Sequence, residues 1–248
     1  MTGDVRELVL TALIFVAALL YASVGHGGAS GYLAAMALVS VPVALMRPSA
    51  LVLNILVSFV ATYKFARVGA FSHRLFWPLA LASIPFAYLG GTLELTSHLY
   101  KPLVGVVLIY AAWQSFHTAQ GSSNVELHPV KIWLLLVTGA ALGLLSGLTG
   151  VGGGIFLSPI LILGRWASTK VVSGIAAAFI LVNSLAGFGG IASKAVPVSF
   201  GLTYWAAAAL LGGYLGAEYG SRRLGNPMIQ RLLSLVLLIA GIKMMATA

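Results

Sequence analysis

The chain of 248 residues contains no cysteine. This absence excludes disulfide bonds, thiolate metal sites and cysteine nucleophiles. Charge is also scarce, because charged residues make up 8% of the chain, whereas a soluble domain carries about 25%. Hydrophobic residues account for 60%. The composition therefore predicts an all-α polytopic membrane protein, in which helices satisfy the backbone hydrogen bonds that lipid cannot.

Acidic residues are the scarcest charged type. The five of them lie near the amino terminus, in a polar central stretch or near the ends of apolar segments: Asp4, Glu7, Glu94, Glu126 and Glu218. No carboxylate pair lies inside an apolar segment, so neither acid–base catalysis nor a hard-cation site is supported. An intramembrane hydrolase would need Ser146 as nucleophile, with His26 as the sole candidate base. The P-loop pattern is absent. We therefore expect no enzyme, no metal and no cofactor.

Basic residues outnumber acidic ones, which gives a net charge of +9. They are scattered singly and form no basic stripe, so we expect no nucleic-acid partner. Whether the segments beside each glycine-rich motif span fully or meet as a hairpin, one face receives Arg6, Arg47, Lys101, Lys194 and Lys243. The other face receives Lys64, Arg67, Arg74, Lys131, Arg165, Lys170, Arg222, Arg223 and Arg231. By the positive-inside rule the second face is cytoplasmic, which predicts a cytoplasmic (inner) membrane protein with both termini outside.

Apolar segments are evenly divided between the two halves of the chain. Their ranges are 8–24, 29–46, 50–66, 75–93, 103–116, 132–148, 155–163, 171–191, 202–217 and 228–246. The segment at 155–163 covers about half of a bilayer core of about 30 Å, so it predicts a half-helix or part of a re-entrant hairpin. The polar stretch between the halves predicts a first repeat at 1–120, a linker at 121–130 and a second repeat at 131–248.

A glycine-rich signature occurs twice, at residues 25–31 and 150–154, with an offset of 125 residues. Unwound backbone survives in a membrane only where it lines a cavity or is buried in protein. Each half has an odd number of effective crossings, which gives the halves opposite orientations. The pattern predicts two inverted-topology repeats, each with a Gly-rich broken or re-entrant helix near the midplane.

Such a turn at the start of a half-helix presents N–H groups that have no intrahelical partner, and the helix dipole adds positive potential there. Glycine permits the unusual backbone angles and the close approach of a ligand. The sequence therefore predicts a binding site for a small anion. Its predicted residues are Gly25, His26, Gly27, Gly28, Ser30, Asn54, Thr149, Gly150, Gly152, Gly153, Gly154 and Asn183.

Several of these residues have structural alternatives. Asn54 and Asn183 occupy similar positions in the two halves, where they either contact substrate or join helices. His26 is replaced by Val151 in the second motif, so it sets selectivity, carries a proton or makes a structural hydrogen bond. The hydroxyls of Ser30, Thr149 and Ser158 either contact the anion or bond back to their own helices. For isolated glycines we expect close helix packing. These are Gly139, Gly143, Gly212 and Gly213.

Three stretches carry a family resemblance: residues 25–32, residues 47–54, and residues 147–154 together with Pro159. They resemble the sulfite exporter TauE/SafE family of bacterial and archaeal membrane proteins, and the likeness covers nearly the whole chain. The resemblance implies export of sulfite, sulfoacetate or a related sulfur oxyanion. Ala29 departs from the family, since many members continue the glycine run there.

These arguments predict a secondary transporter that exports a small sulfur-containing oxyanion across the cytoplasmic membrane. The residues themselves indicate a small anion, and the sulfur comes from the resemblance alone. The alternatives are an anion-selective channel and a non-transporting membrane partner of a sulfur-metabolism enzyme. The expected partners are the anion and the lipid bilayer. The sequence leaves the oligomeric state open, with a homodimer as one arrangement.

Overall fold

The computed structural model describes residues 3–118, 127–193, 201–222 and 227–247, and within them all regular structure is helical. The helices are α1 (Gly3–Ala22), α2 (Ala29–Leu38), α3 (Val43–Arg67), α4 (His73–Thr92), α5 (Ser97–Thr118), α6 (Ile132–Thr149), α7 (Gly154–Leu163), α8 (Thr169–Ala192), α9 (Leu202–Arg222) and α10 (Pro227–Ala246). The all-α prediction is confirmed. Much of the predicted linker at 121–130 lies outside the described residues.

Helix length separates two kinds of element. Among the described residues, five helices are long and apolar enough to cross a membrane, namely α1, α3, α4, α6 and α8. By contrast, α2 and α7 have 10 residues each, or about 15 Å at the helical rise of about 1.5 Å per residue. Both follow a glycine-rich turn directly.

The structure ends α2 at Leu38, whereas the sequence predicted one apolar segment through residue 46. Val41 N–H donates to Met36 O at 2.9 Å, and Ser40 adopts a φ of 58°, so the chain leaves the helix there. Pro42 then disfavours helical geometry at the residue before it. The new helix, α3, starts at Val43 and continues through Pro48.

Polar and apolar side chains are distributed as membrane proteins require. Large apolar side chains point outward, among them Leu8, Leu81 and Leu163, which are 70%, 65% and 81% exposed. The fully buried polar side chains of the described residues are all serine, threonine or asparagine. Small polar groups can hydrogen-bond between helices, and an apolar exterior suits lipid. This pattern supports membrane insertion.

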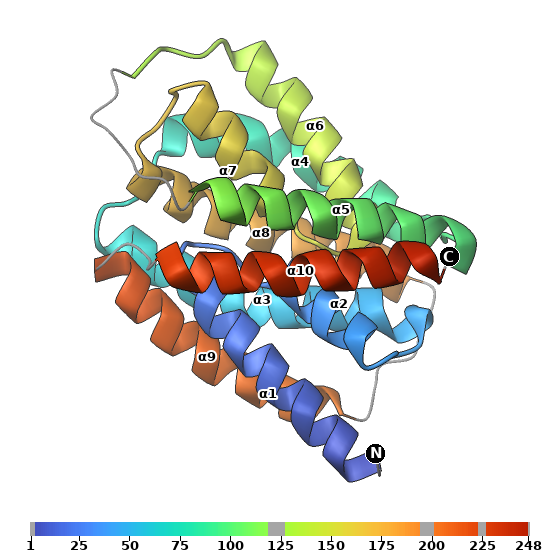
Figure 1. The fold of residues 1–248 in the computed structure, drawn as a ribbon. Helices are drawn as coiled ribbons and strands as arrows, with labels where there is room; N and C mark the ends of the chain where they lie inside the picture. The colour runs from blue at the N-terminus through green and yellow to red at the C-terminus, as the bar shows by residue number, and fades with distance from the viewer. Residues whose placement is uncertain (1–2, 119–126, 194–200, 223–226, 248) are drawn as a thin grey trace.

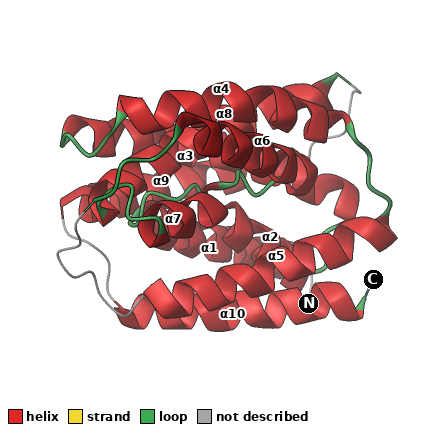
Figure 2. Ribbon diagram, turned by 90° about the horizontal axis from the view of Figure 1, so that it is seen from above, coloured by secondary structure: helices red, strands yellow, loops and turns green. Residues whose placement is uncertain are grey.

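Helices from the two halves of the chain pack on one another. The closest pairs are α4 with α6 and α1 with α9, and α3 lies against α8 between them. Figure 1 shows the first two pairs on opposite sides of the molecule. The helices α5 and α10 form a further pair, which Figure 2 places along the side away from α4. The core is therefore shared by both halves.

Glycines allow these close approaches. On α6, a Cβ at Gly139 or Gly143 would lie 2.4 or 2.2 Å from a backbone oxygen of α4. On α9, a Cβ at Gly212 would lie 2.4 Å from Phe15 O of α1, and one at Gly213 would lie 2.8 Å from the Val57 side chain. Small residues let helix backbones touch in a membrane. The prediction of close packing at these glycines is confirmed.

Candidate functional site

The two glycine-rich turns have the same backbone design. Gly25 and Gly28 have φ values of 77° and 99°, and their counterparts 125 residues later, Gly150 and Gly153, have 81° and 77°. Left-handed geometry of this kind costs glycine little and other residues more. The following helices begin at Ala29 and Gly154 and have the same length. The sequence repeat is thus also a repeat of local structure.

The turns meet at the side chain of Asn54, a fully buried residue of α3. Ala29 N–H, the first of α2, donates to Asn54 Oδ1 at 3.0 Å. Asn54 Nδ2 lies 3.3 Å from Val151 O and 3.4 Å from Ser184 Oγ. One amide therefore accepts a hydrogen bond from the first turn region and donates one to the second.

Glycine is required on both sides of this amide. A Cβ at Gly27 would lie 2.5 Å from Asn54 Oδ1, and one at Gly152 would lie 2.7 Å from Asn54 Nδ2. Gly152 also has a φ of 82°. Any larger residue at either position would have to displace Asn54. The two turns therefore enclose the amide from both halves of the chain.

Within the described part of the chain, the N–H groups of Gly27, Gly28, Gly152 and Gly153 have no hydrogen-bond partner. All four residues are buried. Buried backbone N–H groups are almost always paired, so unpaired ones call for a ligand or water. We call these four N–H groups, together with the Asn54 amide, the cradle.

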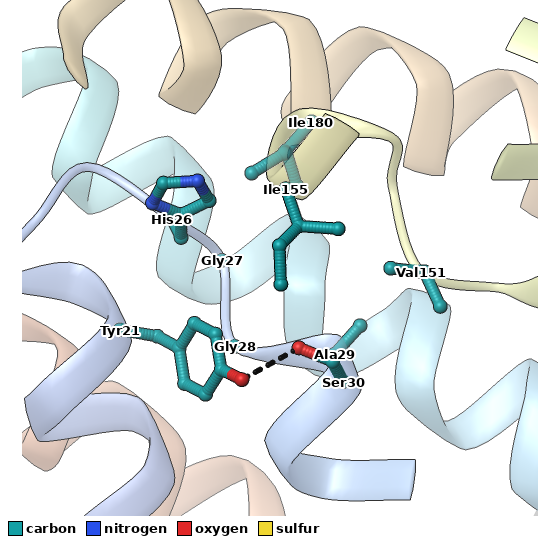
Figure 3. A pocket seen from close by; sticks show the side chains of 9 residues that line it. All are labelled: Tyr21, His26, Gly27, Gly28, Ala29, Ser30, Val151, Ile155 and Ile180. Atoms are coloured by element: carbon teal, nitrogen blue, oxygen red, sulfur yellow. Dashed lines mark hydrogen bonds between the residues drawn. The ribbon is translucent and has the colours of Figure 1, made fainter. Parts of the chain in front are cut away.

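A small cavity adjoins the cradle (Figure 3). Its volume is about 10 Å³, which is the space that one water molecule needs. The lining residues are Tyr21, His26, Gly27, Gly28, Ala29, Ser30, Val151, Ile155 and Ile180. The cavity therefore has room for about one water molecule and not for a larger anion.

His26 connects the first turn to the second half of the chain. Its Nδ1 lies 3.2 Å from Val24 O, and its Nε2 lies 3.1 Å from Ser158 Oγ on α7. Ser158 Oγ also lies 3.1 Å from Gly154 O. With the proton on Nδ1, the neutral ring accepts from the Ser158 hydroxyl; a second proton would direct that hydroxyl to Gly154 O alone.

Other predicted hydroxyls make local bonds. Ser30 Oγ donates to Tyr21 OH at 2.8 Å beside the cavity. Thr149 Oγ1 bonds back to Leu145 O at 2.8 Å and accepts from Val151 N–H at 3.3 Å. Thr149 thus braces the second turn, which is the ordinary role of such residues in helices.

The predicted glycines at the edges of the turns pack against other helices. A Cβ at Gly25 would lie 2.3 Å from Ser173 O, and one at Gly150 would lie 3.2 Å from Arg47. One at Gly154 would lie 2.4 Å from the Ile180 side chain. Gly25 and Gly150 donate their N–H groups to Ala22 O and Ser146 O at 3.1 and 2.8 Å, whereas Gly154 N–H, at the start of α7, has no partner among the described residues, as in the four cradle glycines.

Asn183 makes no hydrogen bond to the cradle among the described residues. Its Nδ2 donates to Phe179 O of its own helix at 2.8 Å, and its buried Oδ1 has no partner among the described residues. The side chain that faces both Gly27 and Gly152 alongside Asn54 is Ile180. The packing of α8 thus places Ile180, and not Asn183, beside the same two glycines as Asn54. Ile180 lies about one helical turn before Asn183.

Sequence reasoning missed Tyr21, Tyr32 and Ile180. Tyr32 OH donates to Gly27 O at 2.7 Å, and Tyr21 accepts from Ser30, so both phenols hold the first turn. A buried tyrosine needs a partner for its hydroxyl, which was an available signal. No feature of the sequence indicated Ile180, because isoleucine is common in apolar helices.

Comparison with known proteins decides the family. The sequence profile described as "Sulfite exporter TauE/SafE" matches residues 10–244. The chain belongs to the sulfite exporter TauE/SafE family. It is 36% identical over 245 residues to a "probable membrane transporter protein y4hK" of Sinorhizobium fredii, which covers 98% of this chain and 99% of that one.

A second relative matches in part. It is a "probable membrane transporter protein MJ0441" of Methanocaldococcus jannaschii, 28% identical over 123 residues that cover 47% of this chain and 44% of the relative. No solved structure matches the chain. The protein is therefore a TauE/SafE-family membrane transporter, and its family and relatives are transporters and not enzymes.

Proposed function

We propose that this TauE/SafE-family protein exports a small sulfur-containing oxyanion, and that the cradle binds it. The observation that carries the proposal is the set of buried, unpaired N–H groups at Gly27, Gly28, Gly152 and Gly153 beside the Asn54 amide. Backbone donors at the start of α2 and α7 favour an anion, since the helix dipoles add positive potential there. The family supports sulfur as the central atom.

The two halves form inverted repeats in this proposal, with residues 1–120 and 131–248 joined by a linker at 121–130. The packing supports it, because equivalent helices of the two halves make equivalent contacts. If α1 to α5 correspond to α6 to α10, the α4–α6 pair corresponds to the α9–α1 pair, and the α4–α8 pair corresponds to the α9–α3 pair. The amino-terminal ends of α2 and α7 also meet at Asn54. Each short helix then runs back toward its own face as a re-entrant element.

The charged ends support the predicted sides of the membrane. Arg6 donates to Ser40 O at 2.8 Å, and Lys243 donates to Leu38 O at 2.9 Å, so both cap the carboxyl end of α2. Cations stabilise that end of a helix. At the other face, α7 ends beside Arg165. We infer that both termini lie outside the cytoplasmic membrane. Of the basic residues that predict this orientation, Lys194 and Arg223 lie outside the described residues.

Export needs no coupling ion. An anion that leaves a cytoplasm at negative potential gains about 2.3 kcal/mol per charge for each 100 mV. The small volume of the cavity, about 10 Å³, favours a carrier over a channel, because a channel filter must hold a continuous path for its ion. Opening and closing around the cradle would then limit the rate.

The test is anion flux in proteoliposomes that contain the purified chain. Sulfite, sulfoacetate, thiosulfate and chloride are compared under an imposed potential of either sign. We expect saturable flux of a sulfur oxyanion that reverses direction with the potential. Flux that ignores the potential and follows a proton gradient would indicate proton coupling, with His26 as its carrier. Single-channel conductance would indicate a channel, and absent flux would leave the non-transporting partner.

Matched glycine variants test the cradle itself. Gly27→Val and Gly152→Val place a branched side chain against Asn54, so flux should fall at least tenfold for each folded molecule. Gly69→Val is the control, because Gly69 also has a positive φ of 72° but has nothing within 4 Å of the position that a Cβ would occupy. It should lose stability and keep its flux. Near-normal flux from Gly27→Val and Gly152→Val would exclude the cradle.

A further inference from the structure

A polar recess lies between the carboxyl ends of α3 and α9, apart from the cradle. Its volume is about 380 Å³, which suits a small polyatomic ligand. Its polar lining comprises Lys64, Arg67, Tyr214, Glu218, Ser221 and Arg222. Three of these side chains are cationic and one is a carboxylate, so the lining has an excess of positive charge.

Glu218 forms ion pairs with two cationic side chains. Its Oε2 forms an ion pair with Lys64 Nζ, and its Oε1 lies 2.5 Å from Arg222. Lys64 is mostly covered, with its side chain 16% exposed, and its Nζ lies 4.0 Å from the centre of the Tyr214 ring. Arg67 forms no ion pair with any described carboxylate and lies over the ring of Tyr63. One carboxylate therefore faces three cations in a recess that has room for a second anion.

One wall of the recess, α9, packs on the segment that leads into the first glycine-rich turn. Gly220, next to Ser221, packs so tightly on the end of α1 that a Cβ there would lie 1.8 Å from Ser23 O. Ser23 precedes Gly25 by two residues. On α3, Lys64 follows Asn54 by ten residues, or about 15 Å. The recess and the cradle are therefore connected by two helices, α1 and α3.

We propose that the recess is a second oxyanion site, where a free oxyanion replaces the Glu218 carboxylate on Lys64 and Arg222 before it moves to the cradle. The oxyanion adds its negative charge to a lining that has three cations and one carboxylate, and the displaced Glu218 side chain stays within the recess. The role as an access site rests on the proposed export function, which puts this face in the cytoplasm. Binding at the recess does not rest on it. A phospholipid phosphate has the same chemistry, so the experiment separates the two sources.

Binding is measured with sulfate as the probe, by calorimetry on the purified chain in nanodiscs of neutral lipid. We expect Lys64→Gln and Arg222→Gln each to weaken sulfate binding about tenfold, the value of a lost charge-assisted hydrogen bond. Glu218→Gln should tighten binding, because it removes the competing carboxylate and keeps the side-chain shape. Arg74→Gln, a cation outside the recess, is the control and should change nothing. Equal sulfate affinity in all five proteins would overturn the proposal.

Cradle binding is separated from recess binding with Gly152→Val. Sulfate binding that persists in this variant belongs to the recess, and binding lost in it would overturn the assignment. Lipid binding is assayed by native mass spectrometry after extraction from membranes that contain phosphatidylglycerol. Two results together would identify a lipid site and overturn the access role. The wild-type chain would retain lipid that the Lys64→Gln variant does not, and the wild-type chain would bind no sulfate in neutral nanodiscs.

Flux tests the access role. Inverted vesicles present substrate to the recess, and right-side-out vesicles present it to the opposite face. We expect Lys64→Gln to raise the half-saturating concentration about tenfold in inverted vesicles only. An equal change on both faces, or none, would overturn the access role. Absence of flux in the wild-type chain would overturn the proposed function. The sulfate titration would still show whether the recess binds an oxyanion.

Discussion

At the scale of single residues, Asn54 is the side chain on which the site depends. It accepts from the start of α2 and donates to the second turn, although these partners lie 25 and 97 residues away in the sequence. Asn183 bonds only its own helix through Nδ2. The two asparagines, similar in the sequence, therefore have different roles in the fold.

Substitution of the two asparagines should give unequal effects. Asn54→Ala leaves the buried Ala29 N–H unpaired, a cost of about 1–3 kcal/mol, so flux per folded molecule should fall about tenfold or more. Asn54→Asp should transport less than Asn54→Ala, because it adds a negative charge beside the anion. Asn183→Ala should stay within about twofold of wild type, since the bond it removes is local.

Flux and the amount of folded protein are measured together for Asn54→Ala, Asn54→Asp, Asn183→Ala and Asn183→Asp. This separates a lost substrate contact from lost folding. If the Asn54 variants fold less well but transport normally for each folded molecule, Asn54 only joins helices. The anion would then be bound by the glycine backbone alone.

At the scale of helices, glycine repeats position the cradle. Glycines four residues apart on α9 meet α1, where Cβ atoms at Gly212, Gly216 and Gly220 would lie 2.4, 2.1 and 1.8 Å from backbone oxygens. On α6, a Cβ at Gly143 or Gly147 would lie 2.2 Å from a backbone oxygen of α4. Since α1 and α6 lead directly into the two turns, these contacts fix where the turns lie.

Alanine at these contacts should separate the helices. Gly143→Ala and Gly216→Ala must push backbone away from backbone, which we expect to cost about 1–3 kcal/mol and to lower the midpoint of thermal unfolding in detergent. Gly189→Ala is the control, because its nearest atom would lie 3.8 Å away. Similar midpoints for all three variants would show that these approaches contribute little to stability.

At the scale of the whole molecule, the proposed inverted arrangement makes a prediction about sidedness. The absence of native cysteine gives single-cysteine variants a background free of other thiols. Val5, Met245 and Leu163 are 46%, 44% and 81% exposed and lie near the ends of α1, α10 and α7. They therefore report on both termini and on the end of one short helix.

A membrane-impermeant maleimide added to intact cells should label Val5→Cys and Met245→Cys. Leu163→Cys should react only after permeabilisation, because α7 ends at the cytoplasmic face in the proposed topology. Permeabilised cells, in which all three thiols are accessible, serve as the control for reactivity. Labelling of Leu163→Cys in intact cells, together with protected termini, would reverse the orientation and put the recess outside.

The sequence by itself determined the membrane class, the helical fold and the repeated turn. The composition indicates that the surroundings are lipid, and the 125-residue repeat of glycines indicates the local backbone geometry of the turns. Both inferences can be made without knowing which distant residues are in contact. The sequence also located the isolated glycines of the helix contacts. Only the tertiary structure decided that α2 ends at Leu38, that Ile180 is the counterpart of Asn54, and that His26 meets Ser158 across 132 residues. Periodicity shows which residues are buried, whereas the identity of a contact depends on how distant helices pack, and that information is not local in the sequence.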